Sequence, residues 1–366
     1  MRKPSNVTQA QIARKLNLST VTVSKALRNH PDISSETRQR VKKLAVAMGY
    51  TPDLIARALS SRRSSIIGVV VPEIDHTFFS TVMKGIFSVA QENDFQIVLT
   101  ISQEDDQREI SNLQTLLAMR VDGILISISQ KTKDAVIFEL IKRKRIPMVF
   151  FDRCLPDPYF SRVVVDDRRG AARAMDYVIG QGYRRIAHLS GPPNISIAEE
   201  RRAGYLDSLK SNGLPVKNEW IISCGFAQED GYKGFKQLID TGDMPEAVFT
   251  ANDPLAIGVY DAAKEVGMRI PDDIGVIGFS DNIISRYLSP SLTTVRQPAV
   301  EIGETAVHLL LDEIQRPEQR QARQIEIPTQ LMVRESCLRG GGSANAFKGN
   351  SIINQTLQAP LMEREL

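Results

Sequence analysis

Residues 8–28 have the sequence TQAQIARKLNLSTVTVSKALR. Thr8 and Gln11 have the spacing of a capping box, in which the hydroxyl accepts from the backbone of the third helical residue and the glutamine reaches back. Asn17 tolerates the left-handed backbone conformation that a tight turn needs. Ser19 is a good N-cap for a second helix. The stretch therefore predicts two short helices joined by a tight turn.

The apolar side chains around this turn have helical spacing. They are Ile12, Ala13 and Leu16 in the first helix, Val23, Ala26 and Leu27 in the second, and Val41, Leu44, Ala45 and Met48 in a third helix that Ser34 caps and Gly49 ends. The second helix then turns Thr, Ser, Lys and Arg side chains outward. Such a unit inserts its second helix into the DNA major groove more often than it forms a structural bundle. We expect residues 1–50 to be an all-α helix-turn-helix DNA-binding domain.

The charge of the chain divides unevenly along its length. Residues 1–63 hold 13 Lys and Arg against 3 Asp and Glu, a net charge of +10, while the other 303 residues hold 33 against 40, a net charge of −7. A basic head on an acidic body indicates a polyanion-binding module attached to a second function. Charge alone would fit an unstructured basic tail equally well, so the helical pattern is what favours a DNA-binding module.

The composition excludes several classes of protein. The chain has 366 residues, of which 42% are hydrophobic and 24% charged, which suits two or three folded domains and excludes disordered, collagen-like and disulfide-stapled chains. The longest apolar run, 66–71, is too short to span a bilayer, and no apolar stretch follows the basic start as in a signal peptide. Three widely spaced cysteines indicate a reduced, cytoplasmic compartment. Neither a metal site nor a cofactor is predicted.

Residues 51–63 form a candidate hinge helix and linker. Pro52 suits a first helical turn. The stretch is shorter than the roughly 12–15 residues that an isolated helix needs in water. We therefore expect this segment to order only when a partner supports it.

From residue 64 to 338, short β-branched runs alternate with helical stretches. The expected strands are 66–71, 96–101, 123–128, 148–151, 163–165, 185–189, 247–250 and 274–279, with helices at 80–93, 106–120, 168–180, 198–212 and 254–266. This alternation predicts an α/β body with doubly wound parallel sheets, which bind ligands beyond the carboxyl ends of their strands. The expected lobes are an N-lobe at about 64–165 plus 295–325, and a C-lobe at about 166–292 plus 326–338.

Residues 339–366 are expected to form a flexible tail. The segment starts with three glycines and a serine and then loses its apolar periodicity. A peptide that docks on a neighbouring surface is the alternative.

The head resembles the LacI/GalR family of bacterial transcription regulators. The matching residues are Ile12-Ala13, Leu18-Ser19, Thr22 to Leu27, Gly49 to Pro52, Ala56 and Leu59. The resemblance implies that Thr20, Val21 and Lys25 contact base edges. It also implies that Thr22 and Ser24 lie near phosphates and bases.

The resemblance also extends to the linker. It implies that Leu59 is a wedge that enters the minor groove and kinks the duplex; an ordinary core leucine is the alternative. Thr8, Ser19 and Ala56 complete the candidate DNA contacts. The chain departs from the family pattern at Asn17, where glycine is usual, and at Lys25, where arginine is commoner and would present a bidentate fork to guanine.

The body resembles the same family to about residue 337. The matching stretches are 68–72, 121–124, 184–189, 251–253, 271–274, 278–279 and 289–295. The resemblance implies two lobes of periplasmic-binding-protein type around an effector, usually a carbohydrate or a purine. The effector-binding residues so implied are Phe78, Phe79, Asp152, Arg201, Phe226, Asn252, Ser280, Asp281 and Gln297.

These side chains suit a sugar. Asp152, Arg201 and Asn252 supply charge-assisted hydrogen bonds to hydroxyls, and an aromatic ring covers an apolar sugar face. Ser280 stands where the family commonly has aspartate, so either that carboxylate contact is lost or Asp281 supplies it. Each residue also has a structural alternative: the phenylalanines as core, Arg201 as a surface residue, and Asn252 as a helix cap.

The sequence predicts a regulator rather than an enzyme. It contains no phosphate-binding loop, dinucleotide fingerprint, zinc-protease motif or nucleophile elbow. The expected protein is a homodimeric repressor of a palindromic operator in double-stranded DNA, switched by a small-molecule effector, most simply a sugar. The alternatives are a sugar-binding protein, or a sugar-modifying enzyme with an accessory DNA-binding module.

Overall fold

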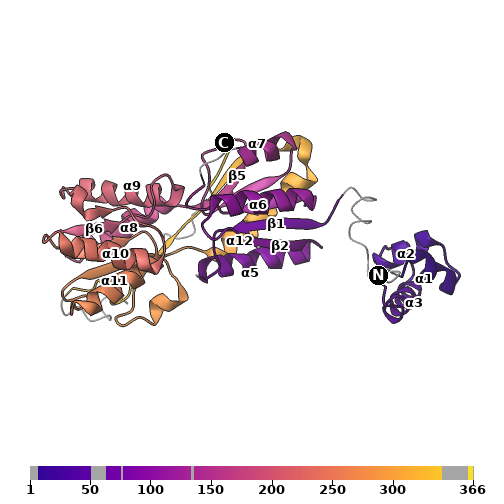
Figure 1. The fold of residues 1–366 in the computed structure, drawn as a ribbon, viewed down its shortest axis with the longest axis horizontal. Helices are drawn as coiled ribbons and strands as arrows, with labels where there is room; N and C mark the ends of the chain where they lie inside the picture. Colours follow the sequence, from indigo (N-terminus) through magenta and orange to yellow (C-terminus); the bar gives the residue numbers. More distant parts are fainter. Residues whose placement is uncertain (1–6, 51–62, 76, 133–135, 340–361, 366) are drawn as a thin grey trace. The chain divides into compact units, whose positions relative to one another are not determined.

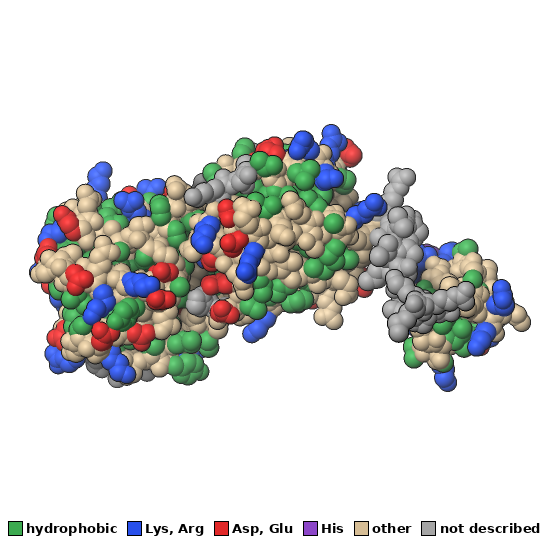
Figure 2. Space-filling view, viewed as in Figure 1, with side chains coloured by type: hydrophobic (Ala, Val, Ile, Leu, Met, Phe, Trp, Pro, Cys, Tyr) green, Lys and Arg blue, Asp and Glu red, His purple; other side chains and the backbone are tan. Residues whose placement is uncertain are grey.

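The computed structural model describes residues 7–50, 63–75, 77–132, 136–339 and 362–365. The chain divides into two compact units, Met1–Ser64 and Ser65–Leu366 (Figure 1). Figure 2 shows Lys and Arg side chains on the visible face of the first unit, whereas acidic and basic side chains mix on that of the second. Among the described residues, no helix is long and apolar enough to cross a membrane.

The first unit consists of three helices around a small core. They are α1 (Gln9–Leu16), α2 (Thr20–Leu27) and α3 (Ser35–Ala47). The fully buried side chains of this core are Ile12, Ala13, Val23, Ala26, Val41 and Ala45. All six belong to the apolar stripes that the helical spacing predicts, and the helix-turn-helix prediction is confirmed.

The second unit contains two predominantly parallel sheets. The first sheet has the order β13-β11-β5-β4-β3-β1-β2 and the second has the order β12-β10-β9-β8-β6-β7. Within the described residues, β13 and β12 are the two antiparallel strands, and each lies at an edge. The prediction of two wound α/β lobes is therefore confirmed.

The first lobe is built around central strands, β1, β3 and β4, that are almost wholly buried. Its strands are β1 (Ile66–Val71), β2 (Gln96–Ile101), β3 (Gly123–Ile126), β4 (Met148–Phe151), β5 (Ser161–Val165), β11 (Arg323–Ile327) and β13 (Met362–Glu365). Its helices are α5 (Thr77–Glu92), α6 (Asp106–Ala118), α7 (Val136–Arg143) and α12 (Ala299–Gln315). Val69 belongs to the core beneath α5 and α12, and its neighbour Val70 to the core beneath α6 and α7. Alternate residues of β1 thus bury opposite faces, as parallel sheets require.

The second lobe repeats this arrangement. Its strands are β6 (Ile186–Leu189), β7 (Ile221–Ile222), β8 (Ala247–Thr250), β9 (Gly275–Ser280), β10 (Thr293–Arg296) and β12 (Gln330–Met332). Its helices are α8 (Asp167–Gly180), α9 (Ser196–Ser211), α10 (Gln228–Asp240) and α11 (Asp253–Glu265), and the 3-10 helices of the unit are η1 (Asn218–Trp220), η2 (Ile283–Arg286) and η3 (Pro317–Gln319). Helices α8 and α9 pack together, as do α10 and α11.

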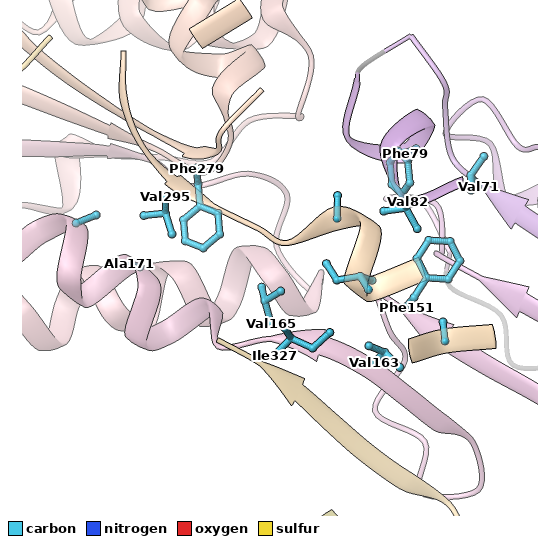
Figure 3. Close-up of a cluster of buried hydrophobic side chains, with 14 of the residues drawn as sticks. Val71, Phe79, Val82, Phe151, Val163, Val165, Ala171, Phe279, Val295 and Ile327 are labelled. Atoms are coloured by element: carbon cyan, nitrogen blue, oxygen red, sulfur yellow. The ribbon is translucent and has the colours of Figure 1, made fainter. Parts of the chain in front are cut away.

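Within the described residues the chain crosses between the lobes at three segments, after β5, after β10 and after β11, and β13 lies again in the first sheet, beyond residues 340–361. One apolar cluster continues through this crossing. Figure 3 shows Val165 and Ile327 between the side chains of the first lobe, such as Phe151, and those of the second lobe, such as Phe279 and Val295. The lobes therefore share a core at the hinge.

The structure differs from the predicted lobe boundaries at two places. β10 pairs with β9 and therefore belongs to the second lobe as far as Arg296. The prediction had placed the change to the first lobe at residue 295. β11 pairs with β5 as far as Ile327, two residues beyond the predicted end at 325. Both shifts arise because a crossing strand completes its ladder with one sheet before the chain changes lobe.

Other differences are small. Strand 123–128 ends at residue 126 and strand 163–165 begins at 161, and helix 80–93 begins at Thr77. In the predicted flexible tail, Met362–Glu365 instead form a strand paired with β11; residues 340–361 and 366 lie outside the described residues.

Candidate DNA-binding surface and effector cleft

Thr8 and Ser19 both cap helices. Thr8 Oγ1 accepts from the Gln11 amide at 3.4 Å, while the Thr8 amide donates to Gln11 Oε1 at 2.8 Å, which completes the capping box. Ser19 Oγ accepts from the Thr22 amide at 3.0 Å. Asn17 has φ 51° and ψ 44°, the left-handed conformation expected for the turn. The local sequence thus sets the angle at which α2 leaves α1.

The outward face of α2 holds the predicted DNA contacts. Thr20 and Val21 are exposed, and Val21 keeps 64% of its surface although it is apolar. Thr22 and Ser24 are half-buried. An apolar side chain held in water beside hydroxyl groups suits contact with a thymine methyl group in the major groove.

Lys25 is paired within the head. Its Nζ lies 2.8 Å from Asp32 Oδ2, with 35% of the lysine side chain exposed. The hydrogen bond from Lys25 and the nearby charge of His30 lower the pKa of Asp32. The predicted contact of Lys25 with DNA therefore requires the lysine to leave or share this partner. Sequence reasoning missed the pair because the two residues lie in different elements, seven positions apart.

Ala56 and Leu59 lie outside the described residues. Their contacts with the minor groove stay predictions.

A small cavity in the second unit gathers most of the predicted effector-binding residues from both lobes. Its volume is about 40 Å³, the space of about three water molecules. Eight predicted residues line it: Phe78, Phe79, Asp152, Arg201, Phe226, Asn252, Ser280 and Gln297. Five further residues, which the sequence analysis did not select as effector contacts, complete the lining: Glu73, Arg153, Ile197, Pro254 and Asn282.

Arg201 is buried in the wall of this cavity, not on the surface. Its Nε donates to Asp167 Oδ1 at 2.7 Å and its Nη1 to the Ala251 carbonyl at 2.6 Å. Its guanidinium carbon lies 3.8 Å from the centre of the Phe279 ring. Nη2 is buried and has no hydrogen-bond partner among the described residues. A buried guanidinium with one unused donor is ready to bind an acceptor atom of a ligand.

Asp167 holds Arg201 from the start of α8. Burial raises the pKa of Asp167 to about 7, against the opposing effect of the Arg201 charge. Neither residue keeps more than 5% of its side-chain surface. The pair is therefore fully desolvated, and each partner depends on the other.

Arg153 is a second guanidinium in the cavity wall. Its Nη1 donates to Glu104 Oε1 at 2.7 Å, and its guanidinium carbon lies 4.6 Å from the centre of the Phe226 ring. Nε is buried without a hydrogen-bond partner in the described residues. Arg153 comes from the first lobe and Phe226 from the second, so this cation–π contact joins the lobes across the cavity. The aspartate–arginine pair after a strand was the signal that could have identified it.

Asp152 and Gln297 meet at the hinge. Gln297 Nε2 donates to Asp152 Oδ1 at 3.3 Å, and Asp152 has φ 59°. Burial raises the pKa of Asp152, while the charges of Arg153 and Arg201 act to lower it. The carboxyl group is thus held close to two guanidinium groups in a dry site.

Asn252 caps a helix, which is the structural alternative that the sequence left open. Its side-chain oxygen accepts from the Leu255 amide at 3.0 Å and caps α11, and its Nδ2 donates to the Phe226 carbonyl at 3.0 Å. Asn252 still lines the cavity. It positions the Phe226 loop against α11, whether or not it also contacts a ligand.

Asp281 is not part of this cavity, contrary to the prediction. Its carboxylate pairs with Arg296 at 2.9 Å and with Arg334 at 2.5 Å. Ser280 and Asp281 have φ values of 126° and 54°, a backbone that costs about 1–3 kcal/mol per residue. The two arginine pairs hold this turn and direct the carboxylate away, into an adjoining groove of about 850 Å³.

Direct contacts close the cleft between the lobes. Thr77 Oγ1 donates to Asn282 Oδ1 at 2.8 Å, and the Cys154 amide donates to Ser196 Oγ at 3.2 Å. Together with the Arg153 contact, they leave less space than a sugar ring occupies. A ligand of that size enters only after the lobes separate or Arg153 moves.

The cavity presents unused guanidinium donors, a carboxyl group and aromatic faces, a set of groups that suits a polar ligand. No group of three or more potential ligands within the described ranges could hold a metal ion.

The sequence matches two family models. Residues 8–53 match the bacterial regulatory proteins of the lacI family, and residues 175–337 match a periplasmic binding protein-like domain. The chain is 34% identical to the "Probable HTH-type transcriptional repressor ExuR" of Bacillus subtilis (strain 168) over 91% of its own length and 99% of that protein. It belongs to the LacI family. The helix-turn-helix, the DNA-binding class and the periplasmic-binding-protein-like body are therefore established, and the matches indicate no enzyme family.

Solved structures agree with this family assignment. The structure of the lac repressor dimer bound to operator and the anti-inducer ONPF has a TM-score of 0.80 against this LacI-family chain. The two are 25% identical, over 91% of this chain and 100% of that one. A complex of the transcriptional regulator CelR with cellobiose has a TM-score of 0.70 and 27% identity, over 90% and 100% of the two chains.

Proposed function

We propose that this protein is a transcriptional repressor whose affinity for its operator is set by a sugar or sugar derivative bound between the lobes. The single observation on which the proposal depends is the buried guanidinium of Arg201, with an unused donor in a cavity lined from both lobes. The family membership of residues 8–53 supplies the DNA-binding half of the proposal.

The cavity lining supports a polyhydroxylated ligand. Arg201 Nη2 and Arg153 Nε offer donors, Asp152 offers acceptors, and the Phe226 ring offers an apolar face. In this structure the Arg153 guanidinium covers the Phe226 ring. A sugar that stacks on the ring would therefore take the place of Arg153. The cellobiose complex of CelR supports a carbohydrate by analogy.

Ligand binding acts by changing the arrangement of the lobes. A ligand shifts the equilibrium only by its difference in affinity for the two states. Entry of a sugar breaks or replaces the Arg153–Phe226 contact, and the three crossing segments bend. The candidate hinge segment, 51–63, precedes β1 in the chain, so we expect movement of the first lobe to alter how Leu59 is presented to the operator.

A homodimer fits the operator best, because two heads match a palindromic site of two half-sites. Around η2, Ile283 and Ile284 keep 45% and 46% of their surface and Tyr287 keeps 76%. Adjacent exposed apolar side chains of this kind favour a protein interface. We assign this surface to the second copy.

The function is tested by ligand and DNA binding together. A thermal-shift screen of sugars and sugar acids should find a ligand that raises the melting temperature, and that ligand should change the midpoint of an operator gel shift. Operator fragments come from genomic selection with the full chain. A ligand that stabilises the protein but leaves every selected operator titration unchanged would contradict the switch, and selection of no palindromic site would contradict the repressor.

The dimer surface has its own test. Ile284→Glu should halve the mass measured by sedimentation and weaken operator binding. Val216→Glu, at a position with the same 46% exposure elsewhere in the second unit, is the matched control. Equal masses for the two variants would place the interface on another surface.

A further inference from the structure

The C-terminal residues Met362–Glu365 form β13, which pairs antiparallel with β11. The pairing sets Arg323 opposite Glu365 and Glu326 opposite Met362. In the sheet order, β11 follows β13 and would be the edge strand without it. An uncovered edge presents unpaired backbone groups to any other strand.

This strand lies beyond the family fold. The periplasmic binding protein-like match ends at residue 337. The intervening residues 340–361 number 22 and, fully extended, reach at most about 75 Å. The length of chain therefore does not restrict the tail to one place on the body, and pairing with β11 requires a preference for that edge.

The register gives such a preference. Glu365 occupies the position opposite Arg323, and Arg364 occupies a position diagonal to Glu326. Opposite charges at opposed and diagonal positions stabilise a strand pair. A slip of one residue would remove both matches and reverse the face on which each residue stands.

β11 is also one of the three crossing segments. The Asp166 amide donates to the Ile327 carbonyl at 3.1 Å, and Arg173 Nη1 donates to the Thr329 carbonyl at 2.8 Å. The first contact joins the end of β11 to the N-cap of α8, where another crossing segment arrives, and the second joins the segment after β11 to the middle of α8. A strand laid along β11 therefore lies against the hinge.

We propose that the edge of β11 is a docking surface for the chain's own C-terminal segment, which adds a strand and stiffens the crossing beside the hinge. The recognition is β-augmentation: backbone hydrogen bonds supply the affinity, and the charge pattern of the tail supplies the register. The proposal concerns the body alone and does not depend on the effector or the operator.

Hydrogen exchange of the full chain tests the proposal. Adjacent residues of a strand direct their amides to opposite sides, so Glu363→Pro with Arg364→Pro removes a ladder donor whichever side faces β11. We expect the β11 amides that face the tail to exchange at least about tenfold faster in this variant. The β11 amides that face β5 should keep their protection.

The matched control is Glu363→Thr with Arg364→Thr, which removes the charges and keeps both amides. Its β11 protection should fall between that of the wild type and the proline variant. Identical exchange at Arg323–Ile327 in all three proteins would overturn the proposal.

A second arm separates attachment within one chain from exchange between copies. Chain 1–339 should show the fast exchange, and a synthetic peptide of residues 355–366 should restore protection to it. Its sedimentation mass should fall only by the mass of the tail. Loss of oligomers on truncation would show that the strand docks on another copy and would overturn docking within the chain.

Discussion

The DNA-binding head and the effector cleft differ in how far along the chain their contacts reach. In the head, Thr8 bonds to Gln11 and Ser19 to Thr22, each three residues away, and the Lys25–Asp32 pair spans seven. These contacts lie at the surface. The two caps form as soon as their own helices form, and the Lys25–Asp32 pair needs only the loop that follows α2.

In the cleft, the corresponding contacts are long-range and buried. Arg201 and Asp167 are 34 positions apart, and Gln297 and Asp152 are 145 apart. Thr77 reaches across 205 positions to Asn282. The Arg201–Asp167 pair forms only when the second lobe is folded, and the other two contacts form only when both lobes are folded and correctly placed.

The difference predicts how each region responds to mutation. An exposed ion pair adds little to the free energy of unfolding because water screens its charges. When one partner of a buried pair is removed, the other is left as an uncompensated buried charge, which is strongly destabilising. Cleft substitutions should therefore damage the whole body, and head substitutions should alter binding with little effect on the fold. The following predictions test this contrast.

Arg201→Ala should have the largest effect. It leaves Asp167 buried without its cation, so the free energy of unfolding of the body should fall by about 3–5 kcal/mol in urea denaturation. Arg168→Ala is a matched control, because Arg168 Nε also lies 2.7 Å from a carboxylate oxygen, that of Asp207, but both side chains are more than half exposed. Equal losses from the two substitutions would remove the contrast between buried and exposed pairs.

The same difference in sequence range explains what could be predicted. The capping box of Thr8 and the turn at Asn17 could be predicted from the sequence, because the residues that form each of them lie within a few positions of one another. The strand and helix pattern of the body followed from apolar periodicity. The Arg153–Phe226 contact was not predicted, because it depends on how the two lobes close.

Asp281 shows the limit most clearly. Its place after a strand predicts a cleft carboxylate, yet Arg334, 53 residues later, takes that carboxylate away from the cavity. The tail strand is a similar case, since it depends on an edge formed by a distant strand. Local sequence defines the elements, and only the fold decides which side chains remain for a ligand.

Glu109→Gln should change the pH dependence of stability. Burial raises the pKa of Glu109 to about 7, and its carboxylate accepts from the Ser129 amide at 2.7 Å and the Thr132 hydroxyl at 2.8 Å. Folding takes up a proton between about pH 4.5 and 7, so stability falls as pH rises through that window, by up to about 3 kcal/mol. The variant should show a smaller fall than the wild type in urea titrations at pH 5 and pH 8, because Asp167, whose pKa burial also raises to about 7, still titrates in it.

Glu92→Gln, at the exposed end of α5, serves as the control for this titration. It should keep the wild-type slope of stability against pH. A slope as steep in Glu109→Gln as in the wild type would assign the titration to other buried carboxyl groups, such as Asp167.

Ser19→Ala should have a smaller and purely local effect. Loss of an N-cap costs about 1 kcal/mol, so the unfolding midpoint of the head should fall while that of the body stays unchanged. Thr20→Ala, at the next and exposed position, should leave both midpoints in place. A fall in the body transition would mean that the two units do not unfold independently.

Asp32→Asn should have the smallest effect on stability and still be visible in DNA binding. It frees Lys25 from its 2.8 Å partner, so operator affinity should rise a few-fold in gel shifts, whereas Lys25→Ala should lower it. If Lys25 contacts a phosphate, its removal should also reduce the slope of log affinity against log salt by about 1. An unchanged slope with a changed base preference would instead place Lys25 on a base edge. In both cases Lys25 should affect DNA binding and leave the stability of the fold almost unchanged. The buried Arg201, by contrast, should also affect the stability of the body.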